Sequence, residues 1–107
     1  MREFKKLFEP GMIGKMEVKN RVIMAPCINF YATVDGYPSD RSLAYYAERA
    51  QGGTGLIAVE STYARRGGYM GRLGCWDDKF IPPLKKLADA IHEGDAKAVV
   101  QVNTHRG

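Results

Sequence analysis

The apolar run at residues 22–25 (Val-Ile-Met-Ala), which stops at Pro26, constrains the fold of this chain more than any other feature. The run lacks polar alternation, as expected of a strand that is covered on both faces. Proline has no N–H with which to continue a ladder, so the residues after it must form a loop. In parallel α/β folds, the loop after a strand's C-terminal end carries ligands and chemistry. The sequence therefore predicts a site at Pro26 and its neighbours.

A second apolar run, at residues 56–59, has the same character and predicts another buried strand. Residues 98–100 predict a third strand. A helix is predicted between the first two strands, from a cap at Ser39 or Asp40 to about Gln51. The glycine pair that follows ends this helix. Its predicted buried face consists of Leu43, Ala44, Ala47 and Ala50.

A second helix is predicted between the last two strands. Asp77 or Asp78 can cap it, Pro82 and Pro83 suit its first turn, and Gly94 ends it. Its predicted apolar stripe consists of Ile81, Leu84, Leu87, Ala88 and Ile91. The alternation of strands and helices predicts an α/β fold with a parallel sheet.

The length of the chain does not suit a complete fold of this kind. An eight-unit barrel takes about 250 residues, and this chain has 107. A doubly wound sheet of three strands would leave its edges unpaired. We therefore expect residues 1–107 to form one partial domain of a longer protein. A hairpin is predicted before the first strand, with its turn at Gly14-Lys15, where it would close the bottom of the barrel.

Composition argues against several classes of partner. The net charge is +4, but the basic residues are spread between acidic ones, so we expect no nucleic-acid partner. Cys27 and Cys75 have neither zinc-ligand spacing nor the number that a disulfide framework needs, which favours a reducing compartment and no metal. No apolar run is long enough for a signal peptide or a membrane span. We expect a cytoplasmic protein.

Polar residues follow the second and third apolar runs. Glu60 and Ser61 follow one, and Gln101, Asn103 and His105 follow the other, so Glu60 and Gln101 are expected to end their strands. Right-handed crossovers place successive parallel strands side by side, so these residues are expected at one rim with Pro26. Glu60 either lies at the ligand end or makes a structural ion pair. The glycine-rich loop from residue 63 to 78 is compatible with a mobile cover over this rim.

A set of short motifs in a fixed order resembles the old yellow enzyme family of NADH:flavin oxidoreductases, over essentially the whole chain. The long loops resemble the 2,4-dienoyl-CoA reductase branch more than the yeast-type enzymes. The motifs are Leu7-Phe8-Glu9-Pro10, Ile13-Gly14, Val18-Lys19-Asn20-Arg21-Val22, Ala25-Pro26, Tyr45-Tyr46-Ala47-Glu48-Arg49-Ala50, Gly55-Leu56-Ile57 through Glu60, Trp76-Asp77-Asp78 and the strand of Gln101.

This resemblance implies a (β/α)8 TIM barrel that holds FMN non-covalently at its C-terminal rim. The reductant would be NADH or NADPH, and the hydride would pass through FMN to an activated alkene or related small-molecule acceptor. The chain would supply the first three β/α units, preceded by the N-terminal β-hairpin. It would be inactive alone, because the family's phosphate loops and proton donor correspond to positions after residue 107. We also expect a homo-oligomer.

The resemblance also implies roles for particular residues. Ala25, Pro26 and Cys27 correspond to the loop that lines the isoalloxazine ring, mostly through backbone. Ser61 corresponds to a small residue that presents its backbone to a ring carbonyl, and Gln101 to a glutamine that reads the pyrimidine edge. A carboxamide suits that edge because it carries both a donor and an acceptor.

Two departures from the family pattern concern the predicted substrate side, which comprises Ile28, Phe30 and His105. The family often has a polar cysteine or threonine at the position of Ile28, so redox tuning from this loop is not expected, and Cys27 is one residue too early to replace it. His105 matches the family's histidine only if one residue is inserted. No catalytic residue is assigned within the chain.

Two alternatives from other classes remain open. A non-enzymatic partial-barrel module could self-assemble through exposed strand edges. A barrel lyase or aldolase would need a Schiff-base lysine or several metal-binding carboxylates at strand ends, and Glu60 is the one acid in such a position.

Overall fold

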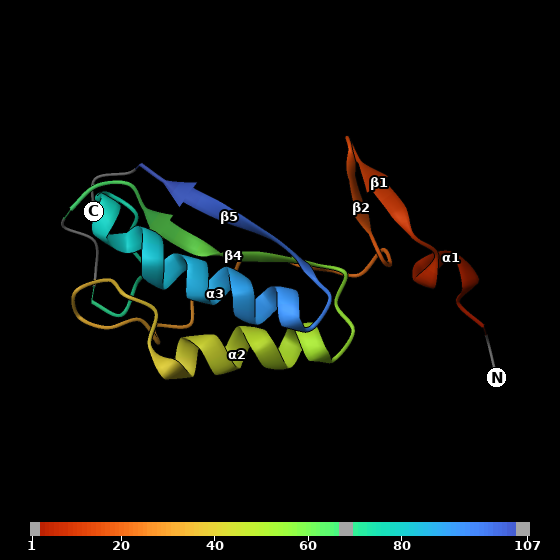
Figure 1. The fold of residues 1–107 in the computed structure, drawn as a ribbon, viewed down its shortest axis with the longest axis horizontal. Coiled ribbons are helices and arrows are strands. Elements are labelled where there is room, and N and C mark those ends of the chain that lie inside the picture. The colour runs from red at the N-terminus through yellow and green to blue at the C-terminus, as the bar shows by residue number, and fades with distance from the viewer. Residues whose placement is uncertain (1–2, 67–69, 105–107) are drawn as a thin grey trace.

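The computed structural model describes residues 3–66 and 70–104. It contains a small hairpin, a three-stranded sheet and two long helices that lie against the sheet (Figure 1). The elements in chain order are α1 (Lys5–Phe8), β1 (Gly11–Ile13), β2 (Met16–Val18), β3 (Ile23–Met24), α2 (Asp40–Gln51), β4 (Leu56–Tyr63), the 3-10 helix η1 (Asp78–Phe80), α3 (Ile81–Glu93) and β5 (Lys97–Asn103).

The three-stranded sheet is parallel, in the order β3-β4-β5. Leu56 of β4 pairs with Ile23 on one side and with Lys97 on the other, so the strands begin at the same level. The helices α2 and α3 follow β3 and β4 in the chain and lie on the same side of the sheet (Figure 1). The predicted strand–helix alternation and its parallel pairing are confirmed.

Helix α2 starts where the sequence places a cap. The Ser39 side chain accepts a hydrogen bond from the Ser42 N–H (3.1 Å), and the Ser42 hydroxyl accepts one from the Ser39 N–H (3.1 Å). The predicted buried face is wrong in part, because Ser42, Tyr46 and Ala50 are buried while Ala44 is exposed. The two hydroxyl residues can turn inward because each finds a hydrogen-bond partner there.

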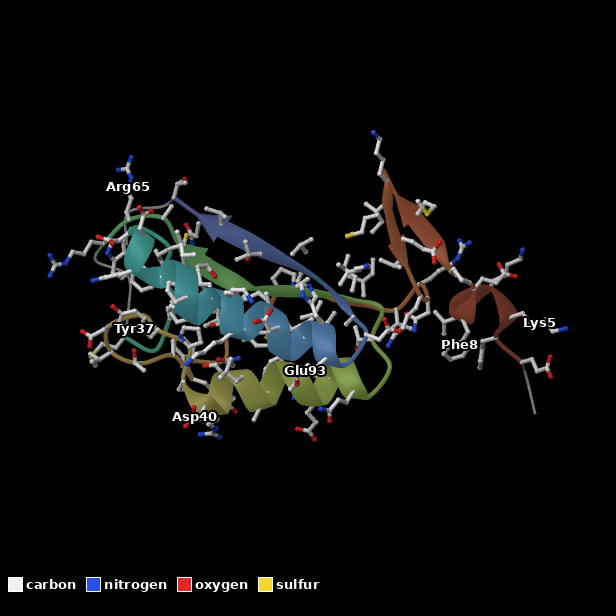
Figure 2. All side chains as sticks on the ribbon, in the orientation of Figure 1. Lys5, Phe8, Tyr37, Asp40, Arg65 and Glu93 are labelled. Carbon is white, nitrogen blue, oxygen red and sulfur yellow. The ribbon has the colours of Figure 1, made fainter. Side chains whose placement is uncertain are left out.

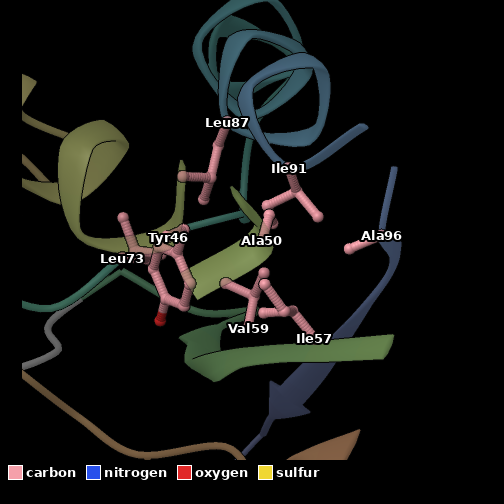
Figure 3. Close-up of a cluster of buried hydrophobic side chains, with 8 residues drawn as sticks. All are labelled: Tyr46, Ala50, Ile57, Val59, Leu73, Leu87, Ile91 and Ala96. Carbon is pink, nitrogen blue, oxygen red and sulfur yellow. The ribbon is translucent and has the colours of Figure 1, made fainter. Parts of the chain in front are cut away.

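Helix α3 follows the short turn η1, whose first residues are capped by the Asp77 side chain. Pro82 and Pro83 lie in its first turn, as predicted. Leu87 and Ile91 are fully buried, but Ile81 is 63% exposed, so the predicted stripe is wrong at its first residue. Figure 3 shows the core that the two helices form with the sheet, comprising Tyr46, Ala50, Ile57, Val59, Leu73, Leu87, Ile91 and Ala96.

Strands β4 and β5 extend further than their apolar runs. β4 continues through Glu60 to Tyr63, and β5 continues through Gln101 to Asn103, whereas β3 has two residues only. The prediction that Glu60 and Gln101 end their strands is therefore wrong. Glu60 Oε1 and the hydroxyls of Ser61 and Thr62 each have a hydrogen-bond partner, so these polar residues can stay in the ladder.

The hairpin lies beyond the N-terminal ends of the parallel strands, at the opposite end from the carboxyl end of β5 (Figure 1). Its turn contains Gly14 with a φ of +59°, which glycine adopts readily. Its place at the bottom of the sheet agrees with the prediction. Of its apolar residues, Val18 is buried, while Met12 and Ile13 are exposed. In the part of the chain that the structure describes, no helix is long and apolar enough to cross a membrane.

The Lys19-Asn20-Arg21 turn is hydrogen-bonded to the segments that follow α2 and α3. Asn20 is buried and donates from Nδ2 to the Gly53 carbonyl (2.7 Å), while its Oδ1 accepts from the Val22 N–H (3.0 Å). Lys19 donates to the Gly94 carbonyl after α3 (3.0 Å). This motif therefore has a structural role at the N-terminal ends of the strands.

We expect Asn20→Ala to lower the free energy of unfolding by about 2 kcal/mol, because it leaves the Val22 N–H and the Gly53 carbonyl without their partner. Urea unfolding of the full-length protein measures this loss. Asn20→Asp keeps the acceptor for Val22 and is expected to lose less stability than Asn20→Ala. Equal losses in the two variants would contradict this account.

Candidate functional site

The carboxyl ends of β3, β4 and β5 lie at the same end of the sheet, away from the hairpin. Figure 2 shows the side chains at this end, near the labelled Arg65 and Tyr37, while Phe8 and Lys5 mark the other end. Ala25, Pro26 and Cys27 come directly after β3 and are exposed. Because β3 is the neighbour of β4, the predicted first loop starts on the same rim as the predicted residues of β4 and β5.

A β-bulge shapes the rim. The register of β4 against β5 shifts between Val59 and Thr62, where three steps along β4 accompany two steps along β5. Glu60 and Ser61 therefore lie opposite Gln101 alone. Bulges occur next to active sites, where they redirect side chains.

Because of the bulge, Glu60 and Ser61 each lie on the opposite face of β4 from the one that regular alternation would give. Ile57 and Val59 pack in the core with the helices, and regular alternation would send Ser61 to that same face. Instead Glu60 meets Tyr46 of α2, and the Ser61 hydroxyl accepts a hydrogen bond from Asn103 Nδ2 (3.0 Å). The resulting polar hollow is lined by Ser61, Gln101, Val102, Asn103 and Thr104.

Glu60 lies beneath the rim rather than on it. Its side chain is 1% exposed, and Oε1 accepts a hydrogen bond from the Tyr46 hydroxyl (2.9 Å). Oε2 is buried without a hydrogen-bond partner among the described residues. Burial raises the pKa of Glu60, while the Tyr46 bond and the nearby Asn29 and Arg72 lower it by less. Of the two predicted roles, the ligand-end one is wrong, and the main partner of Glu60 is a tyrosine instead of a cation.

The raised pKa of Glu60 predicts a pH-dependent stability. Below the ordinary value of 4.5 the carboxyl is protonated in both states, and above it the folded state resists losing the proton. This contribution to stability is therefore present at low pH and lost as pH rises through the folded pKa. We expect Glu60→Gln to remove this fall, as seen by urea unfolding of both proteins from about pH 4 to about pH 8. If the free energy of unfolding changed with pH in the same way in both proteins, the raised pKa of Glu60 would be contradicted.

The two long loops at the rim are fastened to each other. Ala32 N–H donates to the Gly71 carbonyl (3.2 Å), and Gly74 N–H donates to the Gly36 carbonyl (2.9 Å). Residues 73–75 also run beside Tyr63, with hydrogen bonds from Tyr63 N–H to the Leu73 carbonyl and from Cys75 N–H to the Tyr63 carbonyl. These bonds join Gly71 and residues 73–75 to the first loop and to β4, and a mobile cover stays a prediction.

The predicted substrate residues are Ile28, Phe30 and His105, and the structure describes the first two. Phe30 is 58% exposed at the rim and has a φ of +59°, an uncommon backbone conformation for a bulky residue. Ile28 is half-buried, two residues earlier in the same loop. His105 lies outside the described residues. The structure thus gathers Ser61 and Gln101 in one hollow and puts Ile28 and Phe30 in the adjacent loop.

Sequence reasoning missed two residues that shape this site, Tyr46 and Arg72, and it placed Asn103 at the rim without its partner. Tyr46 lies beneath the bulge, and Asn103 is bonded to Ser61. The Arg72 guanidinium lies 5.4 Å from the Phe30 ring centroid and 5.5 Å from that of Tyr63, whose hydroxyl it also contacts. A tyrosine on an alanine-rich helix face was a usable signal, whereas an arginine in a glycine-rich loop gave none.

The described residues of the rim carry groups that suit the binding of a polar ligand. Among residues 3–66 and 70–104, no group of three metal-ligating side chains is close enough to hold an ion. Both cysteines are free, and burial raises the pKa of the Cys75 thiol, which disfavours its thiolate. The rim offers a carboxamide, a hydroxyl and backbone groups, which together suit a planar ligand with alternating donors and acceptors.

Comparison with known proteins places these observations in a family. A family model described as the NADH:flavin oxidoreductase / NADH oxidase family matches residues 6–107. An NADPH dehydrogenase from Listeria monocytogenes serotype 4b (strain CLIP80459) is 39% identical over 105 residues, which cover 95% of this chain and 31% of that protein.

Two solved structures share the fold. A 2-naphthoyl-CoA reductase in complex with 2-naphthoyl-CoA matches with a TM-score of 0.88 and 34% identity, over 94% of this chain and 16% of that one. An old yellow enzyme from Pichia sp. AKU4542 matches with a TM-score of 0.84 and 29% identity, over 92% of this chain and 26% of that one. The chain therefore spans about a third or less of the length of these proteins.

Proposed function

The chain belongs to the NADH:flavin oxidoreductase / NADH oxidase family, and from this premise we propose that it is the N-terminal part of an FMN-dependent NAD(P)H oxidoreductase of the ene-reductase type. The predicted fold class is confirmed, since the matching structures are barrel enzymes and β3, β4 and β5 with their helices are the opening units of such a barrel. Because the chain covers a minor part of its relatives, the activity proposed is that of the longer protein.

The donor set of the rim fits the flavin. The pyrimidine edge of a flavin alternates acceptors and donors, and the exposed Gln101 carboxamide offers one of each. Ser61 lies across the bulge from Gln101 in the same hollow, and Asn103 bonds to it. The observation that carries the proposal is this meeting of Ser61 and Gln101, which are far apart in the sequence and correspond to two flavin contacts of the family.

Each residue contributes a separate function to cofactor binding. We assign the exposed backbone of Ala25, Pro26 and Cys27 to the ring face, the Ser61 backbone to a ring carbonyl, and the Gln101 amide to the pyrimidine edge. Donors near that edge favour the negative charge of the reduced ring, which is how a protein tunes such a cofactor. FMN, when bound, supplies the chemistry of accepting hydride from NADH or NADPH and giving it to an acceptor.

The acceptor is proposed to be a small molecule with an activated alkene or related group. Ile28 and Phe30 would line its apolar side, and His105, outside the described residues, is proposed to face it. Phe30 is held beside Arg72, which supports a fixed position for the ring. The matching proteins differ widely in length, so the 2,4-dienoyl-CoA reductase branch stays a prediction.

We also propose the location and the assembly of the longer protein. The two free cysteines support a reducing, cytoplasmic location. Residues 1–107 are proposed to be one partial domain, and the longer protein is proposed to form a homo-oligomer without nucleic-acid or membrane partners.

A non-enzymatic module that self-assembles is the alternative, and one observation favours it. Val99, Val100 and Val102 of the outer strand β5 are 42%, 50% and 54% exposed. An apolar outer strand with unpaired backbone is a template for association with another chain. This alternative predicts assembly without a flavin.

Anaerobic reduction of the full-length protein tests the proposed function. We expect NADH or NADPH to bleach a flavin absorption band near about 450 nm, and an activated alkene to restore it. Loss of the band with reductant and no recovery with any alkene acceptor would contradict the ene-reductase assignment. A protein that assembles into defined oligomers and shows no band would favour the alternative.

A further inference from the structure

The backbone N–H and carbonyl of Glu60, at the β4 bulge, both hydrogen-bond to side chains. A bulge leaves a residue without its ladder partner, and a buried backbone N–H must find another. The Glu60 N–H donates to the Tyr46 hydroxyl (3.0 Å), and the Glu60 carbonyl accepts from the Thr62 hydroxyl (2.9 Å). Both hydroxyl-bearing residues are fully buried.

The Tyr46 hydroxyl makes a second bond to the same residue. It donates to Glu60 Oε1 (2.9 Å) while it accepts from the Glu60 N–H. A single hydroxyl of α2 therefore fixes both the backbone and the side chain of one bulge residue. Tyr46 is itself part of the buried core, which holds its ring in place.

The direction in which Ser61 faces depends on this contact. With Glu60 turned toward α2, Ser61 turns toward Asn103 and lies opposite Gln101. Without the bulge, strand alternation would send Glu60 to the rim face and Ser61 into the helix-covered face. The bulge is thus what places both proposed flavin contacts in one hollow.

We propose that Tyr46, through its double hydrogen bond to Glu60, is a positioning residue that holds the β4 bulge and so aims Ser61 and Gln101 at the flavin. Within residues 3–66 and 70–104, the hydrogen bonds of the Tyr46 hydroxyl go to Glu60, so Tyr46 acts on the hollow through Glu60. This proposal rests on the proposed function for its ligand. The structural part of the proposal is that Tyr46 of α2 fixes the bulge, and this part involves residues of the chain without FMN.

Tyr46→Phe tests this role in the full-length protein, with Tyr45→Phe as the matched control. Tyr45 is the preceding residue of α2, and its ring contacts Tyr31, Tyr46 and Arg49. We expect the FMN Kd, measured by fluorescence titration, to rise about tenfold in Tyr46→Phe, as for the loss of one hydrogen bond to the ring. The control is expected to stay within about twofold of the wild-type protein.

Hydrogen–deuterium exchange of the flavin-free protein gives a readout that does not require the ligand. Tyr46→Phe should accelerate exchange at residues 60–63 and 101–103, while Tyr45→Phe should leave these segments as in the wild type. Thr62→Val, which removes the other side-chain bond to the bulge, provides a second variant if Tyr46→Phe does not fold. It should raise the FMN Kd several-fold and accelerate exchange at the same segments.

The outcomes separate the inference from the function on which it rests. If Tyr46→Phe and Thr62→Val lower the melting temperature but leave the FMN Kd and the exchange of the bulge as in Tyr45→Phe, the positioning role is overturned. If the wild-type protein shows no saturable FMN binding, the proposed function fails. Accelerated exchange at both segments would then still support the bulge contact, and unchanged exchange would overturn it as well.

Discussion

Gln101→Leu is expected to raise the FMN Kd of the full-length protein by about 30- to 150-fold, which corresponds to about 2–3 kcal/mol. The carboxamide lies in the polar hollow and is exposed, so its donor and acceptor are available to a ligand. Leucine has a similar size but can pair with neither group, and the polar edge of the ring would be left unpaired in a closed site. Fluorescence titration with FMN measures this loss.

The matched control is Gln51→Leu, which makes the same change at the exposed end of α2, away from the rim. We expect it to bind FMN within about twofold of the wild type. Circular dichroism should show the same secondary structure for both variants, because neither glutamine is buried. Equal Kd values for Gln101→Leu and the wild type would remove Gln101 from the cofactor site.

Gly94→Ala is expected to destabilise the protein by about 3 kcal/mol, at the upper end of the range for overpacking. A Cβ at this position would lie 2.6 Å from the Ala50 carbonyl carbon and 2.7 Å from the Gln51 nitrogen, which are backbone atoms of α2. Ala50 is fully buried, so α2 can relieve the clash only by moving away from α3. Urea unfolding gives the change in the free energy of unfolding.

Gly52→Ala is a close control because Gly52 also caps a helix, with an ordinary helical φ of −69°. Its Cβ would meet the Glu48 carbonyl oxygen at 3.4 Å, close to normal contact. We expect its stability to change by less than about 1 kcal/mol. If the two variants were equally stable, the close approach of α2 and α3 that the structure shows would be contradicted.

The sequence was most informative where one local rule decided the outcome. The cap at Ser39, the two prolines of α3 and the apolar run of β4 each act over a few residues, and each lies where it was predicted. The strand order followed from the handedness of parallel crossovers. The resemblance then identified the barrel, which the pattern of elements alone left open.

The misassigned features depend on contacts between distant residues. Tyr46 and Ser42 are inside because each has a partner, which helical periodicity cannot show. The polar sequence at Glu60 and Gln101 suggested a loop. The strands continue past these residues because the hydroxyls of Tyr46 and Thr62 pair with the carboxylate and the carbonyl of Glu60 at the bulge. Asn103 was expected at the rim, but its hydrogen bond to Ser61, 42 positions earlier, could not be seen in the local sequence.

The candidate site was predicted in its location but not in its shape. The rim at the carboxyl ends of the strands, Ser61 and Gln101 were chosen correctly as neighbours. That these two residues face each other depends on one extra residue in β4, and nothing in the local composition marks a bulge in a parallel strand. Sequence patterns specify faces by alternation, and a bulge breaks that alternation.

The intact mass and the visible absorption spectrum of the same purified protein test whether residues 1–107 are part of a longer flavoprotein. We expect a mass well above the 11.9 kDa of this chain, together with flavin absorption near about 450 nm. A protein of 11.9 kDa without any flavin band would contradict it, and assembly through β5 would then be the better explanation of the chain.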